Sequence, residues 1–262
     1  MATSSVEPTI STFSVTKGGK ITETYTYFAE WDLSISLDDN LARLREENLI
    51  HASTDAWLKE MRRIFRVRFG DIQRHRNLVR LAQGPRALAQ ETWAPILLWH
   101  LCFRELLLSD FLEVWLYERK QEGMLRVRAD DVRSYLAELR PRGLLDKEWK
   151  PSSVSRMASG LPSYAADFGL LQGRAVKEMV PYHLPEEALL YILYDLGTEL
   201  SSTDRILSDK RWRRFLLSRQ ELEQELLRLH QHRLLSFELA GSIVSLELPH
   251  ENVNEYVEQL VG

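Results

Sequence analysis

The sequence is organised around residues 149–181, which read WKPSSVSRMASGLPSYAADFGLLQGRAVKEMVP. Ser152 or Ser153 can cap the start of a helix, because a serine oxygen accepts hydrogen bonds from the free N–H groups of a first helical turn. Apolar residues at positions 154, 157, 158 and 161 recur at helical spacing, so one face of this helix is expected in the core. The opposite, polar face carries Ser155, Arg156 and Ser159.

The pattern changes after this helix. Residues 170–171 can begin a short strand and residues 176–180 can form the returning strand, with a tight turn at Gly173. A polar-faced helix followed by a small hairpin with Arg174 and Lys177 is typical of a winged helix-turn-helix. In such a unit the helix enters the major groove of DNA and the hairpin contacts the backbone. The alternative is an ordinary helix packed on an ordinary hairpin.

The composition is that of a globular chain rich in helix. The sequence has 262 residues, of which 44% are hydrophobic and 27% charged, and Gly and Pro are few. We predict a mainly α fold with helix-turn-helix or winged-helix-like units and one or two short β-hairpins. The length allows two domains, which we place at residues 13–109 and 110–262.

The cysteine content indicates a reducing compartment. Cys102 is the single cysteine, which excludes an intramolecular disulfide framework and a cysteine-rich zinc site. The most apolar run, residues 92–103, is too short to cross a bilayer, which needs roughly 20 residues. We therefore expect a cytoplasmic protein with no membrane partner and interpret this run as a core helix.

A basic stretch lies in the first half of the chain. Two short helices, over residues 37–48 and 54–69 with caps at Ser36 and Ser53, are predicted to form a helix-turn-helix-like pair. Between Lys59 and Arg80 the chain has eight Lys or Arg residues against two acids, although the whole chain has a net charge of -4. Such a local excess is an electrostatic footprint for phosphates. The alternative is a solvated helix face whose cations pair with neighbouring acids.

A second basic stretch lies near the C-terminus. Residues 205–219 contain six Lys or Arg residues and one acid. Ser218 and Glu221 form a capping box for the next helix, and residues 234–239 and 243–248 alternate as a hairpin does. This order of helix and hairpin indicates a candidate second wing.

The sequence contains few patterns typical of enzymes. The Lys-Gly-Gly-Lys run at residues 17–20 lacks the other positions of a phosphate loop, and the histidines lack zinc-protease spacing. One pattern, Asp130 or Asp131 followed by Glu148 and Lys150, resembles the acids and lysine of magnesium-dependent nucleases. That chemistry requires Glu148 and Lys150 on one strand, where the neighbouring residues are not strand-like. We predict no metal and no cofactor.

Several motifs resemble the BrxA family of BREX bacteriophage-exclusion systems. They are Thr16-Lys17-Gly18-Gly19 before a helix ending in Trp31-Asp32, the segment Asn40–Leu49 before the basic helix, and Ser152–Arg156 leading to Asp167–Gly173. The resemblance covers about residues 13–180. It implies a small, mainly helical cytoplasmic protein that binds duplex DNA and acts in phage defence beside a methyltransferase and other proteins. Gly160-Leu161-Pro162 departs from a simple continuous helix and is expected to kink or split it.

Together, the residues and the resemblance predict a non-enzymatic protein that binds double-stranded DNA with weak sequence preference, since short serines favour backbone contacts. The alternatives are a protein-interaction scaffold within the defence complex, in contact with other BREX proteins, and a metal-dependent nuclease. The predicted DNA-binding residues are Lys59, Arg62, Arg63, Arg66, Lys150, Ser152, Ser153, Ser155, Arg156, Arg174 and Lys177.

Overall fold

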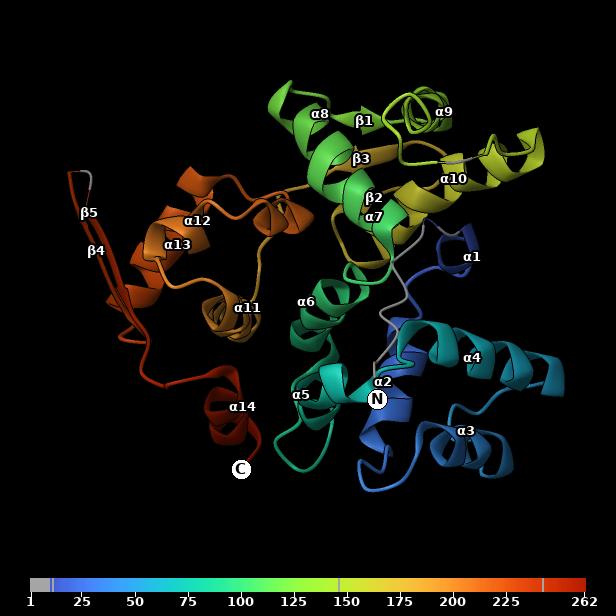
Figure 1. Cartoon of the computed structure of the whole chain (residues 1–262), viewed down its shortest axis with the longest axis horizontal. Coiled ribbons are helices and arrows are strands. Elements are labelled where there is room, and N and C mark those ends of the chain that lie inside the picture. Colours follow the sequence, from blue (N-terminus) through green and yellow to red (C-terminus); the bar gives the residue numbers. More distant parts are fainter. Residues whose placement is uncertain (1–9, 11, 146, 242) are drawn as a thin grey trace. The chain divides into compact units, whose positions relative to one another are not determined.

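The computed structural model describes residue 10 and residues 12–145, 147–241 and 243–262. Over these residues the fold is mainly α-helical with two small antiparallel sheets, as predicted (Figure 1). The chain forms two compact units that interleave along the sequence: unit 1 comprises residues 1–19 and 100–182, and unit 2 comprises residues 20–99 and 183–262. The proposed division into domains 13–109 and 110–262 stays a prediction.

Unit 1 combines short helices with a three-stranded antiparallel sheet of strand order β1-β3-β2. In this sheet Arg126 lies opposite Glu178, and Leu171 lies opposite Met179. The elements of unit 1 are α1 (Thr12–Val15), α7 (Leu106–Asp110), a π-helix (Phe111–Leu116), α8 (Tyr117–Gln121), β1 (Arg126–Val127), α9 (Ala129–Glu138), α10 (Pro151–Asp167), β2 (Leu171–Gln172) and β3 (Lys177–Met179).

The central helix of unit 1 is α10, and it begins earlier than the sequence predicts. Lys150 occupies the cap position and Pro151 is the first helical residue, so Ser152 and Ser153 lie in the first turn and do not cap it. Gly160-Leu161-Pro162 was predicted to kink or split this helix. The split is wrong, because α10 continues through Pro162 to Asp167. Gly169 follows the end of the helix with a φ of +76°, which a glycine adopts without strain.

Asp110 lies inside an unbroken helical run, because α7, the π-helix and α8 follow one another directly from residue 106 to residue 121. An aspartate often caps the start of a helix, but Asp110 does not do so here. The Asp110 carboxylate instead accepts hydrogen bonds from the Tyr135 hydroxyl at 2.9 Å and from Arg142 at 2.6 Å. Asp110 therefore joins the first part of this helical run to α9 and to the turn after it.

Two sequence motifs that lie far apart in the chain are in contact in unit 1. The Gly19 N–H donates to the Asp167 carboxylate at 2.8 Å. A side chain at Gly18 would meet the same carboxylate at 2.9 Å, and one at Gly19 would meet the Phe168 ring at 2.9 Å. Both glycines are therefore required for the N-terminal segment to pass this close to the end of α10.

Unit 2 is built from helices and one long β-hairpin, in which β4 and β5 pair antiparallel. Its elements are α2 (Ile21–Ala29), α3 (Leu37–Glu46), α4 (Asp55–Arg68), a 3-10 helix (Ile72–His75), α5 (Arg76–Arg80), α6 (Gln90–Leu101, of which the last two residues belong to unit 1), α11 (Glu186–Glu199), α12 (Thr203–Leu207), a second 3-10 helix (Lys210–Phe215), α13 (Arg219–Gln231), β4 (Ser236–Ala240), β5 (Ile243–Glu247) and α14 (Val253–Val261).

The first half of unit 2 has an aromatic core. Phe28 is fully buried, and its ring meets Trp31, Phe65, Phe69 and Trp93 edge-on, with centroids 4.9–6.2 Å apart. Such edge-to-face contacts stabilise a core beyond simple burial. This core fixes α4 against α2 and thereby sets which face of α4 meets solvent.

Helix caps in unit 2 largely follow the sequence. Ser36 caps α3, and Ser218 and Glu221 form the predicted capping box of α13. The cap of α4 is Thr54 and not Ser53, because the Thr54 hydroxyl accepts from the Trp57 N–H at 3.2 Å. Helix α11 runs through Gly197 and ends at Glu199. Among the described residues, no helix is long and apolar enough to span a membrane.

Candidate nucleic-acid interface

The predicted DNA-binding residues fall into two groups, one in each unit. Four lie on α4 of unit 2, and seven lie on or beside α10 and the β2–β3 hairpin of unit 1. The α4 group is Lys59, Arg62, Arg63 and Arg66; the unit 1 group is Lys150, Ser152, Ser153, Ser155, Arg156, Arg174 and Lys177. We describe each group within its own unit.

The exposed face of α10 is a row of short polar side chains with one arginine. Residues spaced three or four apart share one face of a helix. This spacing aligns five exposed residues, whereas Met157, Ala158, Leu161 and Tyr164 on the other face are buried. Tyr164 is therefore part of the core. The exposed row is Ser152, Ser155, Arg156, Ser159 and Ser163.

The first turn of α10 presents positive charge. Lys150 and Arg156 are exposed, and neither forms an ion pair with any residue that the structure describes. The Lys150 carbonyl accepts from the N–H groups of Ser153 and Val154 at 2.8 and 3.1 Å. The N-terminus of a helix favours anions because its free N–H groups and its dipole are positive there. The lysine, the arginine and the helix end therefore all attract negative charge.

The β2–β3 hairpin follows α10 directly and ends in a tight turn. Gly173 has a φ of +103°, and a side chain there would meet the Val176 carbonyl at 2.6 Å, so this position requires glycine. Arg174 is exposed in the turn. Lys177 is half-buried and donates from Nζ to the Gly173 carbonyl at 2.7 Å. Arg174 is thus available to a ligand, while Lys177 stabilises the turn that carries it.

The α4 group forms a row on the side of the helix opposite its core. Lys59, Arg63 and Arg66 are exposed and Arg62 is half-buried, at a spacing of three and four residues. Arg66 forms an ion pair with Asp38 of α3, and both side chains are more than half exposed. Arg68, the last residue of α4, is buried at 2% exposure and does not belong to the row.

Several basic residues of segment 205–219 form ion pairs with acids of unit 2 or are buried in it. Arg211 bonds to Asp209 at 2.9 Å and to Glu199 at 2.8 Å. Arg219 bonds to Asp204 at 2.7 Å and to Glu223 at 2.8 Å. Arg214 is 4% exposed, and its guanidinium lies 4.8 Å from the centroid of the Trp99 ring. Half of the six basic residues of this segment are therefore paired with acids or buried, whereas Arg205, Lys210 and Arg213 are exposed.

The candidate nuclease residues do not form the arrangement that this chemistry needs. Residues 147–150 are not in a strand, and Glu148 is exposed 3.9 Å from Arg140. Asp130 forms an ion pair with Arg133, and the Asp131 carboxylate accepts from the Arg128 N–H at 2.7 Å. Within the described residues, no three His, Cys, Asp or Glu side chains are grouped so as to hold a metal ion.

Two features of unit 1 were missed at the sequence level. The strand β1 was not predicted, although the Leu-Arg-Val-Arg run at residues 125–128 alternates as a strand does. The contact of Asp167 with Gly19 was not foreseen either, because 148 residues separate the two positions. With β1, the order of elements around α10 becomes helix α8, strand β1, helices α9 and α10, and the β2–β3 hairpin.

A comparison with models of protein families finds a match that covers most of the chain. The family model named BrxA matches residues 12–194. The chain belongs to the BrxA family. Membership implies a component of a BREX phage-defence system and suggests other BREX proteins as partners. The match includes α4, α10 and the β2–β3 hairpin and ends within α11. A search of curated proteins found no similar sequence.

Proposed function

We propose that this BrxA-family protein is a non-enzymatic component of its BREX system that binds double-stranded DNA with little sequence preference. The observation that carries the proposal is the exposed row of α10, where small polar residues and Arg156 continue from a positively charged first turn. Serine hydroxyls and backbone N–H groups contact phosphates without reading bases. Such contacts position a protein on a duplex but carry little sequence information.

The topology of unit 1 supports a winged helix as the binding unit. Helix α8, strand β1, helices α9 and α10, and the β2–β3 hairpin follow in the order of such a unit, with β3 between the other two strands. In that arrangement α10 is the helix that enters the major groove, and the turn with Arg174 contacts the backbone. Lys59, Arg62, Arg63 and Arg66 supply a second set of phosphate contacts from α4.

The first test is a titration of a labelled duplex by fluorescence anisotropy at several salt concentrations. We expect the triple variant Lys150→Ala, Arg156→Ala, Arg174→Ala to bind more weakly. Each lost phosphate contact should lower the slope of log affinity against log salt by roughly 0.9. A matched control is Arg126→Ala, Arg133→Ala, Arg219→Ala, which removes three arginines that already pair with acids. Equal binding by wild type and the first variant would reject the proposed interface.

The α4 row is tested separately with Arg62→Ala, Arg63→Ala, Arg66→Ala. We expect weaker binding and a flatter salt dependence, uniformly across duplex sequences. Unlabelled duplexes of unrelated sequence should displace the labelled duplex about equally well, since phosphate contacts dominate the binding. Negligible affinity of the wild type at moderate salt, with co-purification of another BREX protein, would favour the scaffold function instead. Magnesium-dependent cleavage that is lost in Glu148→Ala would favour a nuclease.

A further inference from the structure

Unit 1 has a pocket between the end of α9 and the start of α10, which we call the α9–α10 pocket. Its volume is about 300 Å³, at the lower end of the range of protein ligand sites. Leu136 and Ala137 of α9 and Val154 of α10 line it, together with residues of the segment between the two helices. None of the predicted DNA-binding residues, all of which the structure describes, belongs to the lining. The pocket is therefore a separate feature of unit 1.

The inner lining of the pocket is apolar. Leu136 is buried at 4% exposure, and Leu145, Trp149 and Val154 are half-buried. Among the described residues that line the pocket, none is a serine, threonine, asparagine or glutamine. A nucleobase in this lining would leave most of its polar edge without partners, which is unfavourable. A large aliphatic or aromatic side chain needs no such partners and suits the lining better.

The charged side chains of the lining are exposed at the mouth of the pocket, and most are positive. Arg133 and Arg140 expose 47% and 63% of their side chains, and Arg133 pairs with exposed Asp130. Of the described lining residues Glu148 alone is acidic; it lies 3.9 Å from Arg140, and an exposed pair of this kind contributes little. Lys147, next to Glu148 in the chain, is exposed and forms no ion pair with the described residues. The mouth of the pocket therefore attracts carboxylates.

Trp149 gives the pocket the composition of a protein-binding site. Its indole forms no hydrogen bond or ring contact with the residues that the structure describes. Leu144, next to Leu145 of the lining, is 36% exposed, so a further apolar side chain reaches solvent here. Tryptophan and arginine are enriched among the residues that dominate binding at protein interfaces. An apolar pocket with a tryptophan and two arginines therefore indicates a protein partner.

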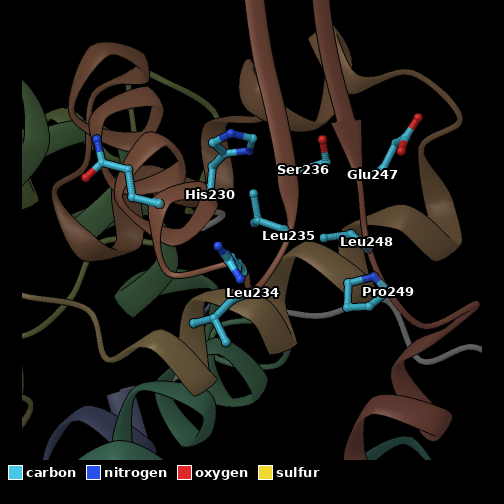
Figure 2. Close-up of a pocket in the computed structure, with 9 residues that line it drawn as sticks. His230, Leu234, Leu235, Ser236, Glu247, Leu248 and Pro249 are labelled. Carbon is cyan, nitrogen blue, oxygen red and sulfur yellow. The ribbon is translucent and has the colours of Figure 1, made fainter.

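The groove at the base of the β4–β5 hairpin in unit 2 lacks this selectivity. Figure 2 shows His230 beside the strand of Leu235, with Glu247 on the other strand. Arg233 also lines this groove, so its exposed charges are of both signs and favour no single class of partner. The two strands contain no lysine or arginine, and the carboxylates of Glu238 and Glu247 would repel phosphates. The hairpin therefore does not suit the candidate second wing.

We propose that the α9–α10 pocket binds a partner protein through one large apolar side chain that carboxylates flank in the partner's sequence. The apolar side chain occupies the lining formed by Leu136, Leu145 and Trp149. The flanking carboxylates face Arg133 and Arg140 at the mouth. Membership of the BrxA family suggests other BREX proteins as partners, and the pocket lies within the residues that the family model matches. Such binding does not require DNA.

The test uses the full chain and short fluorescent peptides in anisotropy titrations. One peptide has a central phenylalanine with two glutamates on each side, and the other has serine in place of the phenylalanine. We expect wild type to bind the phenylalanine peptide about tenfold tighter or more, because the ring leaves water in the pocket. Ala137→Trp places a large side chain at the pocket and should remove this preference. The matched control is Ser134→Trp, which changes an exposed residue of α9 outside the lining.

A second variant tests the charge at the mouth of the pocket. Arg140→Glu should weaken binding of the glutamate peptide about fivefold or more, because like charges then oppose each other. It should strengthen binding of a peptide in which lysines replace the glutamates. The control is Arg104→Glu, which makes the same change at an exposed arginine of unit 1 outside the lining.

Loss of the preference in Ala137→Trp but not in Ser134→Trp, with the changed charge preference of Arg140→Glu, supports the protein-binding pocket. A wild type that does not distinguish the phenylalanine and serine peptides overturns the proposal. An Ala137→Trp variant that keeps the preference, or an Arg140→Glu variant with unchanged charge preference, also overturns it. Displacement of the peptide by the mononucleotide AMP assigns the pocket to a nucleobase and overturns it too. Circular dichroism checks the fold; if Ala137→Trp is unfolded, Arg140→Glu decides, because its side chain is exposed.

Discussion

Segment 205–219 of unit 2 and the region around α10 in unit 1 are both basic in sequence, but they use their charge differently. In segment 205–219, Arg211 and Arg219 each bond to two carboxylates, and Arg214 is buried against Trp99. Around α10, Lys150 and Arg156 are exposed and form no ion pair with the described residues. The density of basic residues therefore does not measure the charge that a phosphate can reach.

The difference arises from which acids folding brings near. Glu199 lies 12 residues from Arg211 in sequence, and Asp204 lies 15 residues from Arg219, yet both pairs are in contact. The first turn of α10 has no acid of its own, because residues 150–156 contain none. The four predictions below would break or sharpen this contrast.

The largest effect is expected for Arg214→Ala. Arg214 donates to the Trp99 carbonyl at 3.2 Å and lies over its ring, so its removal leaves a cavity and takes a hydrogen bond from a buried carbonyl. We expect the free energy of unfolding to fall by about 2–4 kcal/mol in denaturant titrations. Exposed Arg205→Ala is the control and should change stability by less than about 0.5 kcal/mol. Equal stability of the two variants would show that this segment is not structural.

The next effect concerns charge reversal on α10. Arg156→Glu should weaken duplex binding about tenfold and leave the unfolding free energy nearly unchanged, because the side chain is exposed. Arg219→Glu makes the same change at an arginine of segment 205–219 that pairs with Asp204 and Glu223, and it should have little effect on binding. Anisotropy titrations at one salt concentration measure both variants. A larger loss in Arg219→Glu would reverse the contrast between the two regions.

A smaller effect is expected where the N-terminal segment meets α10. Asp167→Asn keeps an acceptor for the Gly19 N–H but removes the charge, which should cost about 1 kcal/mol of stability. Glu138→Gln on the exposed surface of α9 is the matched control. Thermal and chemical unfolding measure the stability of both variants. Identical unfolding curves would mean that the contact does not help to hold α10 in place.

The smallest effect is expected at the start of α4, where the adjacent residues Ser53 and Thr54 are the two candidates for the helix cap. Thr54→Ala should destabilise by about 0.5–1 kcal/mol, since its hydroxyl accepts from the Trp57 N–H. Ser53→Ala should be nearly neutral, because Ser53 precedes the cap. If Ser53→Ala lowers the free energy of unfolding more than Thr54→Ala does, Ser53 is the cap, as the sequence indicates.

The elements that sequence reasoning predicted well are those set by local chemistry. The β4–β5 hairpin, the capping box at Ser218 and the apolar face of α10 follow from turn residues, capping and periodicity. The mainly α fold and the BrxA family were also correct. The hairpin, the capping box and the apolar face of α10 each depend on residues that lie within a few positions of one another.

The features that were missed or misjudged depend on tertiary contacts. Gly160-Leu161-Pro162 was expected to kink or split α10, yet the helix is not split, and Leu161 and Tyr164 are buried in the core. Arg68 belongs to the basic stretch between Lys59 and Arg80, yet it is buried, because its position on α4 coincides with the buried stripe of Met61 and Ile64. For the candidate site, the sequence identified the exposed residues of α10. It could not show which arginines form ion pairs with acids in the folded protein. DNA binding itself stays a prediction.

The interleaving of the two units has a consequence for synthesis on the ribosome. The chain passes from one unit to the other after residues 19, 99 and 182. The segment with Gly18 and Gly19 emerges early, but its contacts at Asp167 and Phe168 are made about 150 residues later. During that interval, which lasts roughly 8–30 s at ordinary elongation rates, Val15 lacks the α10 residues that bury it in the folded protein, so the first helix of unit 1 reaches its final environment only after α10 has been made.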